Sequence, residues 1–427
     1  MLNTKLNTFE QLESNVRSYC RNFTDTFEIA KNFNLYTKKG KEYIDFFAGA
    51  GALNYGHNND FIKKQILAYI ESDKIMHGLD MYTSAKEDFL QSFFNLILNP
   101  KKLDYKVQFC GPTGTNAIEA ALKIARKSKK RTGIFSFTGG FHGMSLGSLS
   151  VTSNDYHRNA AGVNLSDVTF MPYPTDFPFD TIEYIEALLT DSHSGVSKPA
   201  AIIFETVQAE GGVNIASIDW IRRLRQLCDK HDILLICDDI QVGCGRTGNF
   251  FSFERADIIP DIVVLSKSIS GYGLPMSILL IKPELDIWEP AEHNGTFRGN
   301  QLAFIGATAA LEFREIYQLD MSVKSKGTWL EKYLNDHISV LDEKIIIRGL
   351  GLIWGIDLSG LGKQASILAK EIASCCYENG LLIERVGRND TVLKIMPPLT
   401  IDIEGLEKGC IIMKNAMEKN IIQQVKR

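Results

Sequence analysis

Lys267 directly follows a short apolar run and stands between Ser266 and Ser268, at the point where a strand pattern stops. A buried or half-buried lysine there has a depressed pKa, and its amine can attack a carbonyl carbon, whereas the alternative is a lysine at a strand end that simply reaches solvent. Asp238 and Asp239 follow another apolar run, where a carboxylate can hold a ligand cation, accept a proton or cap a helix. A reactive lysine and an acid for a ring nitrogen are the pair that pyridoxal phosphate requires.

The segment GPTGTN at 111–116 opens a helical pattern immediately after a strand pattern. Backbone N–H groups at a helix N-terminus bind phosphate, and glycines let the phosphate approach closely. The segment is not GxGxxG and no GK[ST] follows it, which argues against a dinucleotide or P-loop site. Phe141 and His142 follow the next strand pattern, where an aromatic ring can stack on a planar cofactor.

Five short apolar runs are the strands expected to position these residues: 106–109, 133–137, 200–204, 233–237 and 262–265. Together with helical patterns at 115–130 and 219–231, they predict an α/β fold with a mostly parallel sheet. Ligands bind beyond the carboxyl ends of the strands in such sheets. We therefore expect one rim to gather the loop at 111–116, Phe141, His142, Glu205, Asp238 and Lys267.

The chain after about residue 319 has the pattern of a smaller α+β unit. It contains strand candidates at 345–347, 353–358 and 392–395, and a helix candidate at 365–378 that ends before a glycine. Strand-like pieces near the start, such as 42–46, are expected to join this unit. The predicted organisation is a large cofactor-binding domain at 76–318, a small domain at 319–427, and an N-terminal segment at 1–75 that joins the small domain.

Composition narrows the class of protein. The chain has 427 residues, enough for two domains with sizeable cores. Its 47 basic and 51 acidic side chains give a net charge of −4, which offers no reason to expect nucleic acid or an anionic membrane as a partner. No secretory signal or membrane-spanning run is apparent. The eight cysteines are scattered without a CxxC pair, which indicates reduced thiols in the cytoplasm and no metal site.

Seven phrases, in order along the chain, resemble the class III (omega-amino-acid) aminotransferases of the fold-type I pyridoxal phosphate enzymes. They are DFFAGAGALNYGHN, GPTGTNAIEAALKIAR, FHGMSLGSLS, ETVQAEGG, DDIQVGCGRTG, LSKSISGYG and KIMPPLTI. The resemblance covers nearly the whole chain. It implies a large domain with a mostly parallel sheet, a smaller α+β domain, and pyridoxal 5′-phosphate as the cofactor.

The resemblance also implies roles around the cofactor ring. Lys267 matches the family's Schiff-base lysine, and Asp238 matches the acid that pairs with the pyridine nitrogen. Gln241 matches the residue near the phenolic oxygen, and Phe141 matches the aromatic residue that stacks on the ring. Glu205 matches the first of two acids in a strand-end motif.

Further matches concern the phosphate and the substrate. Gly114 and Thr115 match the phosphate-binding turn, and Thr296 matches a threonine that reaches the phosphate in the neighbouring subunit. The last match implies a homo-oligomer with its active site at the subunit interface. Glu210 matches the second acid of the strand-end motif, which helps govern substrate binding. Lys394 stands where many members have an arginine for the α-carboxylate, although a lysine cannot make the planar bidentate pair.

Other departures from the family pattern are Ala209, where glycine is usual, and Cys110, where a proline is usual in the nearer relatives. Within the family, five phrases are similar to the branch that forms 2,4-diaminobutyrate: FFAGAGALNYGHNN, MHGLDMYT, VQFCGPTGTNA, GYGLPM and AEHNGTFRGN. This likeness implies L-glutamate as amino donor and L-aspartate 4-semialdehyde as acceptor, the first step of ectoine biosynthesis.

Several alternatives remain open from the sequence. Relatives act on ornithine, acetylornithine, 4-aminobutyrate or lysine, and an aminomutase-type relative needs no external donor. A regulator that merely binds the cofactor would tolerate loss of Lys267 or Asp238, and both are present. A nicotinamide oxidoreductase is disfavoured because the strand-to-helix turn lacks the dinucleotide fingerprint.

Overall fold

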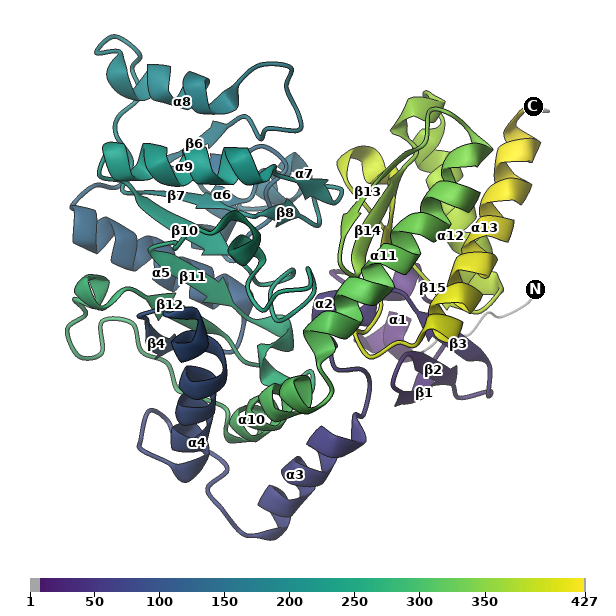
Figure 1. The fold of residues 1–427 in the computed structure, drawn as a ribbon, viewed down its shortest axis with the longest axis horizontal. Coiled ribbons are helices and arrows are strands. Elements are labelled where there is room, and N and C mark those ends of the chain that lie inside the picture. The colour runs from purple at the N-terminus through teal and green to yellow at the C-terminus, as the bar shows by residue number, and fades with distance from the viewer. Residues whose placement is uncertain (1–7, 426–427) are drawn as a thin grey trace.

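The computed structural model describes residues 8–425, so residues 1–7 of the predicted N-terminal segment lie outside the described range. Figure 1 shows two bodies, with a large sheet in the left-hand one and the C-terminal helices in the right-hand one. The boundaries at residues 75 and 318 stay a prediction. Within residues 8–425, no helix combines the length and the apolar character needed to cross a membrane.

A seven-stranded sheet forms the centre of the larger body, in the order β4–β12–β11–β10–β7–β5–β6. Its strands are β4 (Lys106–Phe109), β5 (Ile134–Phe137), β6 (Val168–Met171), β7 (Ala201–Phe204), β10 (Leu234–Asp238), β11 (Ile262–Leu265) and β12 (Ile278–Ile281). Only β12 runs against its neighbours, β11 and β4. The predicted α/β class with a mostly parallel sheet is confirmed. β6 and β12 were not among the five predicted strands, and the antiparallel direction of β12 leaves no trace in its apolar run.

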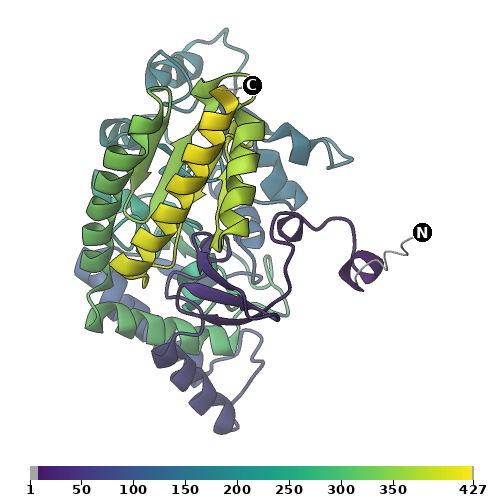
Figure 2. The ribbon, with the colours of Figure 1, turned by 90° about the vertical axis from the view of Figure 1, so that its right-hand side faces the viewer.

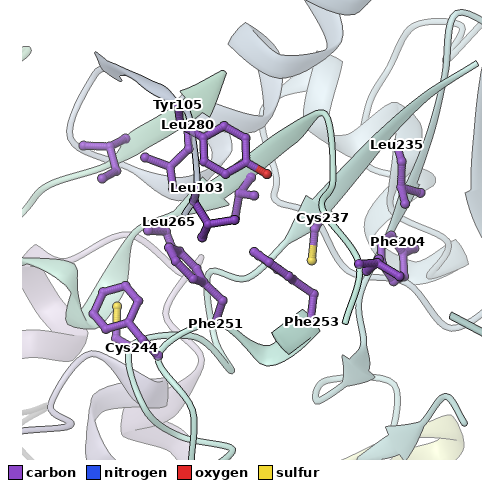
Figure 3. Packing of buried hydrophobic residues seen from close by; sticks show 14 of the residues in the cluster. Leu103, Tyr105, Phe204, Leu235, Cys237, Cys244, Phe251, Phe253, Leu265 and Leu280 are labelled. Atoms are coloured by element: carbon purple, nitrogen blue, oxygen red, sulfur yellow. The ribbon is translucent and has the colours of Figure 1, made fainter. Parts of the chain in front are cut away.

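Helices cover both faces of this sheet. Alternate residues of β11 point to opposite faces, so Ile262 and Val264 pack with α5 (Gly114–Lys129), while Val263 and Leu265 face the other side. The second face carries α4 (Ser84–Phe93), α9 (Ile218–Lys230) and α10 (Gln301–Ile316). Figure 3 shows part of this core, including Phe251, Phe253 and Leu265. The predicted helices at 115–130 and 219–231 correspond to α5 and α9, with their boundaries displaced by one residue.

Shorter elements connect the sheet and the helices. They are α3 (Asp60–Glu71), α6 (Leu146–Val151), α7 (Asp155–Arg158), α8 (Thr181–Thr190) and the hairpin of β8 (Val207–Gln208) with β9 (Asn214–Ile215). Polar caps fix the helix starts, as where Ser217 accepts the N–H of Trp220 at the start of α9. Such a cap stabilises a helix by about 1 kcal/mol.

The smaller body is built on an antiparallel sheet in the order β13–β14–β17–β16. Its strands are β13 (Ile346–Leu350), β14 (Ile353–Asp357), β16 (Glu384–Val386) and β17 (Val392–Ile395). Figure 2 shows α11 (Leu319–His337), α13 (Ile403–Val425) and α12 (Ala365–Glu378) side by side in front of it. The predicted helix at 365–378 and strand at 392–395 match α12 and β17, so this α+β unit is confirmed.

The N-terminal residues contribute a second small sheet, in the order β1–β2–β3–β15. Its strands are β1 (Phe27–Lys31), β2 (Asn34–Thr37), β3 (Glu42–Asp45) and β15 (Leu381–Leu382). Because β15 lies parallel to β3, the beginning and the end of the chain share one sheet. The strand-like pattern at 42–46 corresponds to β3, and the assignment of residues 1–75 to the small domain stays a prediction. Two further short elements near the start of the described chain are α1 (Thr8–Leu12) and α2 (Ala48–Gly51).

Candidate active site

The carboxyl ends of the central strands surround a cavity of about 160 Å³. β10 ends at Asp238, β7 is followed by Glu205, and β11 is followed by Ser266 and Lys267. Nine of the residues singled out in the sequence line the cavity: Gly114, Thr115, Phe141, His142, Glu205, Glu210, Asp238, Gln241 and Lys267. The structure therefore brings together the residues that strand ends were expected to gather. Thr296 and Lys394 are not part of the lining.

Asp238 and Asp239 face different surroundings, although they are adjacent in the sequence. Asp238 is buried, with Oδ2 at 2.7 Å from Nδ1 of His142, and its Oδ1 accepts the N–H of Ile240 at 3.1 Å. Asp239 does not line the cavity, and its Oδ2 accepts the N–H of Ser252 at 2.9 Å. Only Asp238 can therefore serve a ligand in the cavity, and Asp239 fixes a loop.

His142 lines the cavity and contacts Asp238, a contact that the sequence did not reveal. Its side chain is 1% exposed and lies against Asp238, while its backbone N–H donates to Oγ1 of Thr152 at 2.9 Å. At this distance the imidazole can hydrogen-bond the carboxylate and fix its orientation. The FHG phrase was visible in the sequence, but the direction of the histidine ring depends on the packing of the loop.

Lys267 begins a short helical turn, η5 (Lys267–Ser270), with a left-handed backbone at φ +49°. Residues other than glycine rarely adopt this conformation, and such strain is concentrated at functional sites. Burial lowers the pKa of Lys267 below its ordinary value, and the carboxylate of Glu210 acts in the opposite direction. An amine with a lowered pKa is more often unprotonated, which makes it a better nucleophile and a better base.

The first turn of α5 forms one end of the cavity. The side chain of Thr113 caps the helix, which leaves Gly114 and Thr115 at its first positions. Oγ1 of Thr115 and Oγ of Ser145 are 2.6 Å apart, so a second hydroxyl lies beside this turn. A Cβ on Gly143 would lie only 2.6 Å from Oγ1 of Thr115, so the glycine keeps this space open. Free N–H groups and the helix dipole make this end suitable for an anion.

Phe141 and Glu205 connect the loop after β5 to the end of β7. The N–H of Phe141 donates to Oε2 of Glu205 at 3.1 Å. Burial, followed by the charge of Asp238, raises the pKa of Glu205 well above its ordinary value. A neutral Glu205 adds no second negative charge beside Asp238 and can donate a hydrogen bond.

Lys394 lies on β17 outside the cavity, with a fully buried side chain. Its Nζ is 2.7 Å from Oε1 of Glu210 and 2.9 Å from Oε2 of Glu384. Burial acts to raise the pKa of Glu210, but the ammonium groups of Lys394 and Lys267 lower it to about 2. The sequence did not single out Glu384, which faces Lys394 across the β16–β17 pair. The cation expected to hold a substrate carboxylate therefore already has two carboxylate partners.

Thr296 is exposed, in the connection between β12 and α10, and it does not approach the cavity of its own chain. The family resemblance assigns this threonine to the site of a neighbouring subunit. Its place on the outside of a single chain is compatible with that role, which stays a prediction.

The family model described as aminotransferase class-III matches residues 20–417. The chain belongs to the class III aminotransferases, and it is a pyridoxal-phosphate-dependent enzyme. It is 51% identical over 423 residues to a diaminobutyrate–2-oxoglutarate transaminase of Halalkalibacterium halodurans, a match that covers 98% of this chain and 97% of that protein. A protein of the same name from Streptomyces avermitilis is also 51% identical, with 97% of this chain and 98% of that protein covered.

Solved structures share the fold. An ornithine aminotransferase of Toxoplasma gondii, with partial occupancy of PLP at its active site, has a TM-score of 0.83 at 24% identity and covers 98% of this chain and 94% of its own. A transaminase from the marine bacterium Virgibacillus has a TM-score of 0.83 at 20% identity, with 99% and 97% covered. These likenesses confirm the predicted fold-type I architecture.

The side chains around the cavity fit pyridoxal phosphate. Oε1 of Gln241 is buried and has no hydrogen-bond partner among the described residues, so it can contact a polar group of a ligand. The N-terminus of α5 suits a phosphate, Asp238 suits a protonated ring nitrogen, and Lys267 suits an aldehyde carbon. All three features line one cavity.

Proposed function

We propose that this enzyme transfers the amino group of L-glutamate to the aldehyde carbon of L-aspartate 4-semialdehyde, giving L-2,4-diaminobutyrate and 2-oxoglutarate. The observation that carries the proposal is the 51% identity to two diaminobutyrate–2-oxoglutarate transaminases, over 98% and 97% of this chain. The phrases MHGLDMYT and AEHNGTFRGN, which lie outside the family's common motifs, support the same branch.

Lys267 carries the proton transfers. Bound pyridoxal phosphate supplies an aldehyde for the amino group and a protonated ring that accepts electrons from Cα. With the cofactor bound, Nζ of Lys267 would act as the base that takes the proton from Cα of glutamate and as the acid that returns it on the cofactor side. Water would release 2-oxoglutarate and leave the amino group on the cofactor. With the semialdehyde as acceptor, Lys267 would move a proton in the reverse direction, and the amino group would leave in diaminobutyrate.

The other lining residues hold the ring. Asp238 keeps the ring nitrogen protonated, because a carboxylate beside a pyridinium favours the charged form of both groups. His142 keeps Asp238 in place through the 2.7 Å contact. Gln241 would contact the phenolic oxygen and Phe141 would stack on the ring, while Glu205 supports the loop that presents Phe141.

Glu210 and Lys394 act together in substrate binding. A polar cleft of about 660 Å³ adjoins the cavity and shares Phe141 and Glu210 with it, so Glu210 lies where the two spaces meet. A substrate that enters along this cleft passes Glu210 before it reaches Lys267. Lys394 keeps Glu210 ionised and oriented, which is a role for the lysine that differs from direct pairing with a substrate carboxylate.

The test follows both half-reactions in purified holoenzyme. Glutamate is added first and aspartate semialdehyde second, and the visible absorbance and the formation of diaminobutyrate are followed together. We expect glutamate to bleach the cofactor band and the semialdehyde to restore it with one diaminobutyrate per site. If glutamate bleaches the band but the semialdehyde does not restore it, the proposed acceptor is wrong, and ornithine, acetylornithine and 4-aminobutyrate become the substrates to examine.

Two matched acceptors sharpen this test. Glutamate 5-semialdehyde is one methylene longer, and succinate semialdehyde lacks the α-amino group of the proposed acceptor. If the pocket is built for the shorter chain with an α-amino group, kcat/KM for each of these two acceptors should be roughly tenfold or more lower than kcat/KM for aspartate semialdehyde. Equal kcat/KM for all three acceptors would contradict the assignment to diaminobutyrate formation.

A homo-oligomer with shared active sites is part of the proposal. The segment before α4 exposes the apolar side chains of Ile75, Met76, Leu79, Met81 and Tyr82, and the segment that carries Thr296 exposes that of Phe297. The rings of His77 and Phe297 are 5.4 Å apart, so the two segments form one surface. Exposed apolar groups of this kind mark interaction sites. A second copy seated there would receive Thr296 beside the phosphate held by Gly114 and Thr115.

Subunit complementation tests the shared site. We expect Lys267→Ala and Thr296→Asp to be inactive separately, the second because a carboxylate repels the phosphate. In mixed oligomers formed by joint refolding, one site combines an intact Lys267 with an intact Thr296 from its neighbour. A one-to-one mixture of a dimeric enzyme should regain about one quarter of wild-type activity. Failure of the mixture to regain activity, with mixed oligomers demonstrated by mass, would contradict the role of Thr296.

The setting of the reaction is the final part of the proposal. Diaminobutyrate formation is the entry to ectoine biosynthesis in the family branch that the phrases resemble, and we assign this chain to that pathway in the cytoplasm. Growth at high salt of a strain lacking this gene tests the assignment, since the defect should be relieved by added ectoine.

A further inference from the structure

Four consecutive residues, Ala48–Gly51, have a left-handed backbone, with φ values of +49°, +57°, +55° and +88°. We call this segment the left-handed turn. Glycine adopts this conformation easily, but Ala48 and Ala50 do not, because Cβ approaches the carbonyl oxygen that follows. Such a backbone persists only where the surrounding structure holds it, so the contacts of the turn indicate its purpose.

The left-handed turn is held at both ends. On one side, Oδ1 of Asp45 accepts the N–H groups of Phe47 and Ala48 at 2.8 and 2.7 Å. On the other side, Nε2 of Gln241 donates to the carbonyl oxygen of Ala50 at 2.9 Å. The turn therefore bridges the N-terminal sheet and the loop after β10 that lines the cavity.

Ser268 makes the tightest connection to the turn. Its Oγ donates to the carbonyl oxygen of Gly51 at 2.6 Å and accepts the N–H of Asn54 at 3.1 Å. Ser268 is buried and directly follows Lys267, whose own backbone is left-handed at φ +49°. Two strained segments, far apart in the sequence, are thus joined by one hydroxyl group.

We propose that Ser268 is a positioning residue, whose hydroxyl fixes η5 against the left-handed turn and so holds Lys267 with its amine in the cavity. The inference rests on the proposed role of Lys267 as the cofactor-bound lysine. Without the tether, η5 can relax toward an ordinary backbone, and the Nζ position then changes although Lys267 itself is intact. The effect of Ser268 is therefore on the geometry of the lysine, with no contact to substrate.

Two neighbouring serines show whether the proposed role of Ser268 depends on its hydrogen bonds or only on its being buried. Ser270 lies in the same η5 turn and is fully buried, but its Oγ has no hydrogen-bond partner among the described residues. Ser266 precedes Lys267, and its Oγ donates to the carbonyl oxygen of Met276 at 2.8 Å, away from the turn. Of these three serines, only Ser268 joins Lys267 to the left-handed turn, and Ser270→Ala is its matched control.

The experiment uses the full chain and no substrate. Ser268→Ala, Ser268→Thr and Ser270→Ala are prepared without cofactor. The affinity for pyridoxal phosphate and the pH at which the bound cofactor's absorbance titrates are measured. Ser268→Ala should bind the cofactor roughly tenfold more weakly, since two buried hydrogen bonds are lost. The pH at which the bound cofactor's absorbance titrates should also shift, because the bond between Lys267 and the cofactor is reoriented. Ser268→Thr should recover part of both properties, and Ser270→Ala should match the wild type.

Equal behaviour of Ser268→Ala and Ser270→Ala in affinity and titration would overturn the proposal. If Ser268→Ala does not fold, Asp45→Ala decides, because it removes the oxygen that accepts the N–H groups of Phe47 and Ala48 at the far end of the left-handed turn. The same weakening and titration change in Asp45→Ala supports the proposal, and wild-type values overturn it. Borohydride reduction of the wild type, followed by peptide mass analysis, tests the Lys267 assignment independently. If reduction fixes the cofactor to a residue other than Lys267, the proposed function is wrong, and this result is distinct from a failure of the Ser268 proposal.

Discussion

Replacement of Lys267 by alanine is expected to lower turnover by at least about a thousandfold, since both the covalent attachment and the proton transfer at Cα depend on its amine. The protein should still take up pyridoxal phosphate through Asp238 and the N-terminus of α5, but borohydride should no longer fix the cofactor to the chain. Steady-state assays with glutamate, together with mass analysis after reduction, measure both effects. Small primary amines added to the variant should restore part of the turnover, because they can supply the missing base.

Lys326 provides a matched control for the Lys267 substitution. It is a partly buried lysine on α11 whose pKa burial lowers to about 8, and its Nζ donates to the carbonyl oxygen of Leu399 at 2.9 Å. Lys326→Ala should affect stability more than chemistry. Turnover of Lys267→Ala at the wild-type rate would rule out the proposed mechanism.

The lowered pKa of Lys267 also predicts the direction of a pH effect on this step. The base must be unprotonated, so the rate of Cα proton removal falls as the pH decreases through the pKa of the lysine. Because burial lowers that pKa from its ordinary value of 10.5, the fall should occur at a lower pH than for an exposed lysine. Single-turnover rates with ordinary glutamate and with glutamate deuterated at Cα are compared across pH. A slower rate with the deuterated substrate identifies Cα proton removal as the step that is measured.

Asp238→Ala is the second substitution with a large expected effect. The variant should retain the cofactor on Lys267 but lose turnover by roughly a hundredfold or more, because an unprotonated ring is a weaker electron acceptor. Rapid-mixing measurements of the glutamate half-reaction detect this loss, and absorbance confirms that the cofactor is bound. Full activity of Asp238→Ala would contradict the assignment of this acid to the ring nitrogen.

The adjacent acid supplies the control for Asp238. Asp239 is fully buried, burial raises its pKa to about 7, and it accepts the N–H of Ser252 outside the cavity. Asp239→Asn should therefore leave the cofactor absorbance unchanged. His142→Asn should show a smaller loss than Asp238→Ala, roughly tenfold, because only one hydrogen bond to Asp238 is removed. Equal losses in Asp239→Asn and Asp238→Ala would indicate a general effect of charge on folding.

The local pattern of apolar and polar residues was sufficient to predict most of the helices and strands discussed above. The runs at 106–109 and 262–265 coincide with β4 and β11, and the helix at 365–378 coincides with α12, because buried strands and amphipathic helices leave a periodic signature. The runs that form β6 and β12 were not predicted as strands, and the direction of a strand leaves no such signature. The same limit applies to pairing, and the parallel contact of β15 with β3 was anticipated only as an association of the two chain ends.

The residues of the candidate site could likewise be predicted only in part from the sequence. Lys267, Asp238 and Glu205 could be found from the sequence because each directly follows a strand run, and parallel strands place their ends at one rim. The partners of these residues are decided by side-chain direction. His142 turns toward Asp238, and Glu384 reaches Lys394 across an antiparallel pair.

The sequence by itself determined the family, the cofactor and the residues at the strand ends, since these depend on residue type and order along the chain. Only the tertiary structure decided the environment of each charged group and the conformation that presents it. Lys394 became a buried ion with two acidic partners, and Ser268 became the tether between two left-handed segments. Burial, ion pairing and backbone strain depend on which distant segments come into contact, and no local pattern of residues records that.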